Sequence, residues 1–226
     1  MADGLSTRAY QFSIVALGSM NPRLHHPLWY RIIGAITEEE EALATASPNL
    51  VVIPPLARFE VAGITIACQE NRWEISATQP ALRTRIRDVA ALVFKKLYET
   101  PIQTYGLNNN FEIETGIAKV SKCLGDLFLS LDLGPKAEGE PTSTLNFLDV
   151  QKGRRIQVAL GPSSLSQDVL TFAYNTEYHP TDEMGNRPGY FDFGELVSRH
   201  FDADYQAALD TASKVVMSLT HRCGGK

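Results

Sequence analysis

The spacing of apolar residues over positions 58–113 predicts an antiparallel sheet with a helix on one of its faces. Apolar and polar residues alternate over 58–78, and the Ala62-Gly63 pair is typical of a tight turn between strands. An apolar stripe with helical spacing follows over 81–98, with Pro80 placed where a helix begins. A further strand is expected over 102–113. This order of elements indicates an α+β fold.

The same patterns extend to the rest of the chain. They predict a strand over 10–16, a helix that Thr37 opens before four glutamates, an edge strand over 50–53, a helix over 116–131, strands over 145–150, 155–160 and 169–174, and a helix over 194–219. We therefore expect one or two antiparallel sheets with amphipathic helices packed on one face. The element order also admits two pseudo-symmetric βββα-like halves.

The segment 134–142, GPKAEGEPT, has the composition of a linker or loop. It would divide an N-terminal α+β half, residues 1–133, from a C-terminal βββα half, residues 143–226. A single domain with a surface loop at 134–142 remains the alternative, because 226 residues suit either one large domain or two small ones.

Composition and charge narrow the class of protein. The chain is 44% hydrophobic and 21% charged, as expected of a globular protein with a core of ordinary size. Its net charge of −5 provides no overall basic field for nucleic acid or anionic lipid. No apolar run reaches the ~18 residues of a membrane span, and the N-terminus has no apolar signal region. We expect a cytoplasmic protein without membrane contact.

The three cysteines, Cys68, Cys123 and Cys223, lie far apart in the sequence. An odd number without C-x-x-C spacing argues against a disulfide framework and against structural zinc. We expect Cys68 and Cys123 to be small buried residues. The sequence predicts no metal site and no cofactor.

Two short motifs carry a resemblance to a known family. They are the helical Arg85-Ile86-Arg87-Asp88 run followed by Thr100-Pro101-Ile102 and Gly106-Leu107-Asn108, and the N-terminal Asn21-Pro22 with His26-Pro27-Leu28-Trp29. The first half of the chain resembles an uncharacterised bacterial family of scattered distribution. The resemblance implies a shared fold, no known activity and no catalytic residues. Scattered distribution suits systems of antiviral defence or mobile elements.

The segment with Gly18, Ser19, His25 and His26 is the first candidate for chemistry. A strand that ends in Gly-Ser-x-Asn-Pro before histidines resembles the start of nucleotidylyltransferases, in which Gly and His contact ATP phosphates. The histidines fall one or two positions short of that spacing, and the I-S-x-T-x-x-R element of that family does not follow. A nucleotide-binding enzyme is therefore the alternative to a loop with a purely structural role.

The polar face of the helix over 81–98 is the second candidate. It carries five basic residues, Arg83, Arg85, Arg87, Lys95 and Lys96. Such a face could follow a phosphate backbone, which would make the chain a nucleic-acid-binding protein. A solvated face opposite an apolar stripe is the other interpretation.

An aromatic segment around residues 172–193 is the third candidate. Tyr174, Tyr178, Tyr190 and Phe191 lie among Pro, Gly and Asn, a composition typical of protein interfaces, although these rings could instead fold back onto the core. We expect a non-enzymatic protein–protein interaction subunit or adaptor of a bacterial multi-protein system. We expect this subunit to bind a protein partner or to associate with itself as an oligomer.

Overall fold

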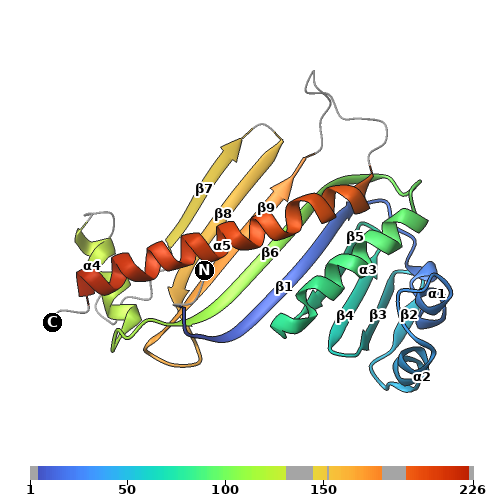
Figure 1. The fold of residues 1–226 in the computed structure, drawn as a ribbon, viewed down its shortest axis with the longest axis horizontal. Coiled ribbons are helices and arrows are strands. Elements are labelled where there is room, and N and C mark those ends of the chain that lie inside the picture. The colour runs from blue at the N-terminus through green and yellow to red at the C-terminus, as the bar shows by residue number, and fades with distance from the viewer. Residues whose placement is uncertain (1–4, 131–144, 152, 180–191, 224–226) are drawn as a thin grey trace.

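Nine antiparallel strands form one continuous sheet in the order β2-β3-β4-β5-β1-β6-β9-β8-β7, and the two longest helices cross one of its faces (Figure 1). The computed structural model describes residues 5–130, 145–151, 153–179 and 192–223. The predicted α+β class with helices on one face is confirmed.

The elements follow the predicted order closely. The strands are β1 (Thr7–Gly18), β2 (Val51–Ile53), β3 (Leu56–Val61), β4 (Ile64–Gln69), β5 (Arg72–Ala77), β6 (Ile102–Glu114), β7 (Leu145–Gln151), β8 (Arg154–Pro162) and β9 (Val169–Tyr178). The α-helices are α1 (Pro27–Ile32), α2 (Glu38–Ala46), α3 (Arg83–Lys96), α4 (Val120–Ser130) and α5 (Phe193–Cys223), and the 3₁₀ turns are η1 (Pro22–Leu24) and η2 (Pro80–Leu82).

Local sequence explains the turns and caps. Ala62 and Gly63 both have positive φ, which is the backbone of a two-residue hairpin turn between β3 and β4. Thr37 and Glu40 form a capping box at the start of α2, since each side chain bonds the other's backbone N–H.

Alternation decides which side of each strand is buried. In β6, Tyr105, Leu107, Phe111 and Ile113 are buried under the helices together with Asn109, whereas the even-numbered residues from Gly106 to Glu112 face the other way. Asn108, Asn109 and Asn110 do not form a bulge, because they pair in unbroken register with β1 on one side and β9 on the other.

The two predicted halves share this sheet. β6 of the first half pairs with β9 of the second over ten residues, from Tyr105–Tyr178 to Glu114–Val169. The second half has the predicted βββα order, whereas the first half contains six strands, so the halves do not repeat element for element. Buried residues of both halves join in one hydrophobic core.

Helix α5 runs beside α3 (Figure 1). The two helices are in contact at Gly194, a buried residue in the first turn of α5. A Cβ atom at this position would lie 2.7 Å from the carbonyl oxygen of Ala91. The adjacent Phe193 ring contacts Phe94 with a centroid distance of 4.4 Å. Glycine at 194 therefore allows the two helix backbones to approach.

Replacement of Gly194 by alanine should force α5 away from α3. We expect Gly194→Ala to lower the free energy of unfolding by about 1–3 kcal/mol, because a backbone atom cannot yield to the added methyl group. Urea unfolding followed by circular dichroism would measure this. The matched control is Gly106→Ala, whose Cβ would meet no atom closer than 3.7 Å. Equal effects of the two substitutions would contradict the close-packing explanation.

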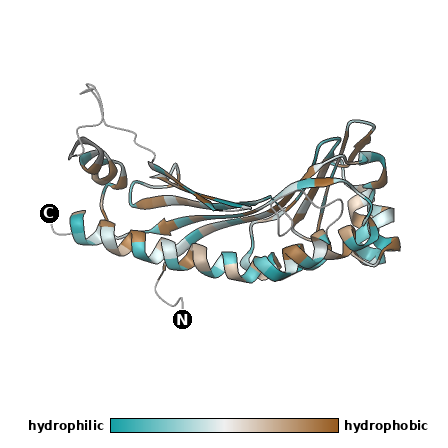
Figure 2. Ribbon diagram, turned by 90° about the horizontal axis from the view of Figure 1, so that it is seen from above, coloured by the Kyte–Doolittle hydropathy of each residue, from teal (hydrophilic) through white to brown (hydrophobic). Residues whose placement is uncertain are grey.

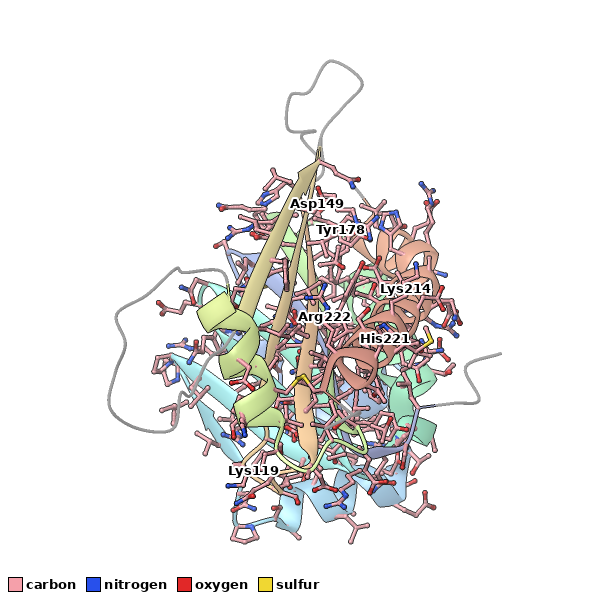
Figure 3. The ribbon with its side chains drawn as sticks, turned by 90° about the vertical axis from the view of Figure 1, so that its left-hand side faces the viewer. Lys119, Asp149, Tyr178, Lys214, His221 and Arg222 are labelled. Atoms are coloured by element: carbon pink, nitrogen blue, oxygen red, sulfur yellow. A yellow bond between two sulfur atoms is a disulfide. The ribbon has the colours of Figure 1, made fainter. Side chains whose placement is uncertain are left out.

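Cys123 of α4 and Cys223 at the end of α5 form a disulfide across a sequence separation of 100 residues (Figure 3). The expectation that this chain has no disulfide is therefore wrong. The two cysteines look unrelated in the sequence, and only the path of α5 along the sheet brings its last turn to α4. Cys68 is the buried free cysteine that the sequence predicts.

Loss of this disulfide should destabilise the fold by releasing a long loop in the unfolded chain. We expect Cys223→Ser to reduce the free energy of unfolding by about 2–5 kcal/mol. Urea titrations with and without dithiothreitol would test this. Added reductant should destabilise the parent chain and leave the variant unchanged; a parent chain insensitive to reductant would contradict the prediction.

Candidate functional site

The face of the sheet opposite α3 and α5 carries no helix over its middle in the described part of the chain (Figure 2). Polar residues without charge form a row across its central strands. In strand order, this row contains Ser76, Ser13, Asn108, Asn175 and Gln157. Asn108 Nδ2 donates a hydrogen bond to Ser13 Oγ at 2.9 Å. We call this surface the uncovered face.

The polar row on the uncovered face ends at the edge strand β7, where Leu148 pairs with Gln157. β7 has seven residues, and no described strand pairs with its outer side. Three of its apolar side chains are largely exposed: Phe147 by 56%, Leu148 by 57% and Val150 by 68%. Because neighbouring residues of a strand face opposite ways, apolar surface lies on both sides of this edge.

The opposite edge of the sheet is protected. β2 has only three residues, and Pro54 and Pro55 follow it directly. Short strands and prolines are common devices that prevent another chain from pairing with an edge. β7 has neither a proline nor a lysine, and Asp149 is its single charged residue (Figure 3). The two edges therefore differ in their capacity to accept a further strand.

A hollow of about 190 Å³ lies in the uncovered face over Val15 and Gly106. Arg72 and Arg155 both contribute to its lining. Each arginine is paired with a carboxylate on the same face, Arg72 with Glu74 at 2.8 Å and Arg155 with Glu177 at 3.9 Å. The hollow thus offers amides and charges of both signs.

The segment Gly18–His26 follows β1 and is fixed by backbone hydrogen bonds. Ser19 N–H donates to the Pro101 carbonyl at 3.1 Å, and Met20 N–H donates to the Glu70 carbonyl at 2.7 Å. A Cβ atom at Gly18 would lie 2.1 Å from the Pro101 oxygen, so this glycine permits close approach of two chain segments. His26 Nδ1 caps α1 by accepting from Leu28 N–H at 3.2 Å.

His25 is buried, with 2% of its surface exposed. Trp73 Nε1–H donates to the Tyr30 hydroxyl oxygen at 3.0 Å, and the Tyr30 hydroxyl shares a hydrogen bond of 2.9 Å with His25 Nδ1. Because no other described group accepts the proton of the buried Tyr30 hydroxyl, we assign that proton to the bond with His25 Nδ1, which places the His25 proton on Nε2. Burial lowers the pKa of His25 to about 4, so the ring is neutral at physiological pH.

Acid should destabilise the protein through His25. Its folded-state pKa of about 4 lies below the usual value of 6.5, so between these pH values the unfolded chain binds a proton that the native chain does not. Stability is therefore lost as the pH falls through this window, by about 2 kcal/mol between pH 7 and pH 5. The measurement is urea unfolding at both pH values.

The matched variant for this prediction is His25→Asn. The Asn carboxamide oxygen can accept from Tyr30 but does not titrate, so the variant should lose this share of the pH dependence. An unchanged dependence on pH in His25→Asn would assign the acid sensitivity to other groups.

The basic residues of α3 divide into two groups. The three arginines are paired: Arg83 with Asp202 at 2.7 Å, Arg85 with Glu40 at 2.6 Å, and Arg87 with Asp88 at 2.8 Å and with Asp202 at 3.0 Å. Arg83 also lies over the Tyr205 ring, 4.2 Å from its centroid. Lys95 and Lys96 are exposed in the last turn. Most of the predicted basic face therefore holds α2 and α5 against α3.

Tyr174 and Tyr178 do not lie on an exposed loop, as an interface would require. Both belong to β9 and are buried, with exposed fractions of 5% and 8%. The Tyr178 hydroxyl donates to the Asp204 carboxylate at 2.8 Å, and Arg154 pairs with the same carboxylate at 3.0 Å. Burial raises the pKa of Asp204 above its ordinary value. The other two predicted interface residues, Tyr190 and Phe191, lie outside the described residues.

His200 and Tyr105 extend this buried cluster. The His200 ring stacks on Tyr178 with a centroid distance of 4.4 Å, and its Nδ1 shares a hydrogen bond of 2.7 Å with the Tyr105 hydroxyl. Burial lowers the pKa of His200 and raises the pKa of Tyr105. The cluster joins β6, β8 and β9 to α5, and its contacts account for the position of the helix.

The described residues contain no group of three or more His, Cys, Asp or Glu side chains arranged to bind a metal ion. None of the described helices combines the length and the apolar character that crossing a lipid bilayer needs.

Comparison of the chain with protein-family models and with curated proteins finds no match. We therefore infer its function from the geometry described above. Of the four residues that the sequence suggested for nucleotide binding, Ser19 and His25 line one pocket, whereas Gly18 and His26 do not contribute to its lining. The sequence did not indicate β7 as a binding edge, although the absence of proline and lysine from 145–151 is a usable signal.

Proposed function

We propose that the chain is a protein-binding subunit that accepts a strand of a partner polypeptide on the outer edge of β7. The observation that carries this proposal is the edge strand β7 of a nine-stranded sheet, whose outer side pairs with no described strand and whose Phe147, Leu148 and Val150 side chains are largely exposed. The backbone groups on the outer side of such a strand form a template for another chain. Sheet extension of this kind is a common mode of peptide recognition.

The side chains of β7 favour a partner strand with apolar residues on both faces. Phe147 points to the face that the helices cover, beside Val158, and Leu148 points to the uncovered face beside Gln157. An added strand would shield both of these side chains from water. Complete burial of one such side chain contributes roughly 1.5–3 kcal/mol, so two of them supply a substantial part of a binding free energy.

The uncovered face supports the same function. Its row of Asn, Ser and Gln side chains reaches β7 at Leu148, and amides can both donate to and accept from peptide groups. Arg155 and Glu177 lie beside this row with opposite charges. A polypeptide that pairs with β7 could therefore continue over this face with its polar groups satisfied.

Photo-crosslinking from β7 tests this proposal. The photoreactive residue p-benzoylphenylalanine would replace Leu148 in one variant and Val150 in another, each expressed in the native host. Mass spectrometry would identify the crosslinked residues. Because side chains two positions apart share one face of a strand, the two variants should label residues two positions apart in one segment of one partner. The same probe at Leu43, which is 74% exposed on α2, is the control.

Leu148→Lys should block this interaction. A lysine on an edge strand disfavours pairing, and the loss of apolar burial should weaken association by roughly tenfold or more. The crosslink from position 150 should then disappear, while the free energy of unfolding stays within about 0.5 kcal/mol, as for most exposed positions. Scattered crosslinks without a common segment, or the same products from position 43, would refute sheet extension at β7.

A further inference from the structure

A pocket of about 310 Å³ lies between the Gly18–His26 segment and the C-terminal end of α3. Its volume is within the range of small-molecule sites. It is distant from β7 in the sequence and in strand order, since its lining comes from the segment that follows β1 and from residues 96–101, whereas β7 is an edge of the sheet four strands away from β1. Any role of this pocket is therefore independent of the protein-binding function proposed above.

The His25 ring presents a hydrogen-bond donor, Nε2–H, to the pocket. The His25 ring forms part of the lining, and its Nδ1 is occupied by the Tyr30 hydroxyl. No described residue accepts a hydrogen bond from Nε2. Nε2 is also not fully enclosed, because it does not belong to the completely buried polar atoms that lack a hydrogen-bond partner. The relay from Trp73 through Tyr30 therefore holds a neutral ring with its Nε2–H available to a ligand.

The remaining lining provides charges of both signs and apolar surface. Lys96 supplies a cation, Ser19 supplies a hydroxyl donor, and Glu99 supplies a carboxylate. The C-terminal end of α3 adds negative partial charge, which opposes a phosphate group. Met20 and Leu24, both in the lining, offer apolar contact.

From this arrangement we infer that the pocket binds a small zwitterion of the amino-acid class. The ligand carboxylate accepts hydrogen bonds from His25 Nε2–H and the Ser19 hydroxyl and pairs with Lys96. The ligand ammonium group pairs with Glu99 beside the end of α3. An apolar ligand side chain packs against Met20 and Leu24.

A nucleotide fits the same lining poorly. Phosphate groups favour helix N-termini and several cations, whereas this pocket has one lysine, one glutamate and a helix C-terminus. A ligand with one negative and one positive group matches these charges. Binding measurements can therefore distinguish a nucleotide ligand from an amino-acid ligand.

The test is a fluorescence titration with each common amino acid, using Trp29 as the reporter. Its ring lies 5.6 Å from the His25 ring, so occupation of the pocket should change its emission. For leucine, two analogues test the contribution of each charged group to binding. 4-Methylpentanoate lacks the ammonium group, and isoamylamine lacks the carboxylate. We expect saturable binding of an amino acid and, if leucine is bound, at least tenfold weaker binding of both analogues.

Matched variants locate the site. His25→Asn keeps the acceptor for Tyr30 but has no donor at the Nε2 position, whereas His25→Gln places an amide donor there. We expect binding to weaken about tenfold or more in His25→Asn and in Lys96→Gln, and to be retained in His25→Gln and in the neighbouring Lys95→Gln. Urea unfolding of each variant shows whether the fold is intact.

Several outcomes would overturn the inference. These are no binding of any common amino acid, binding of 4-methylpentanoate as tight as that of leucine, or unchanged binding in a folded His25→Asn variant. Saturable binding of ATP without binding of any amino acid would also overturn it and would favour a nucleotide site at the Gly18–His26 segment.

Discussion

The carboxylate of Asp204 is the contact on which the arrangement of this fold depends most. It is almost fully buried, and it accepts from the Tyr178 hydroxyl of β9 while it pairs with Arg154 of β8. Buried charge is costly unless its partners are well placed, so α5 has few acceptable positions on the sheet. That position in turn brings Gly194 against α3 and Cys223 against Cys123.

Local sequence predicted most of the fold, because its signals act over a few residues. The alternation in β3–β5, the Ala62-Gly63 turn and the apolar stripe of α3 all appear where expected. Contacts between distant segments were not predictable in the same way. The pairing of β6 with β9 and the Cys123–Cys223 disulfide depend on how complete elements assemble, and no short-range pattern encodes either of them.

The candidate sites show the same contrast between local signals, which the sequence reveals, and contacts between distant segments, which it does not. The sequence marked Ser19 and His25 as unusual, and both line one pocket. It could not show which His25 nitrogen carries the proton, because that assignment depends on the hydrogen bond that Tyr30 accepts from a tryptophan in β5. The arginines of α3 were identified by residue type alone, and the carboxylates that pair with them come from α2 and α5 as well as from α3. Residue type predicts chemistry, whereas the partners decide whether that chemistry is available.

The pairing of β6 with β9 also sets a constraint on biosynthesis. While the chain emerges from the ribosome, β6 can pair with β1 as soon as residue 114 is available, but its other edge has no partner until β9 is complete at Tyr178. For that interval a long strand with Phe111 and Ile113 is open to pairing with other nascent chains. Co-translational folding of this protein should therefore depend on chaperone protection of the central strand more than on protection of either final edge.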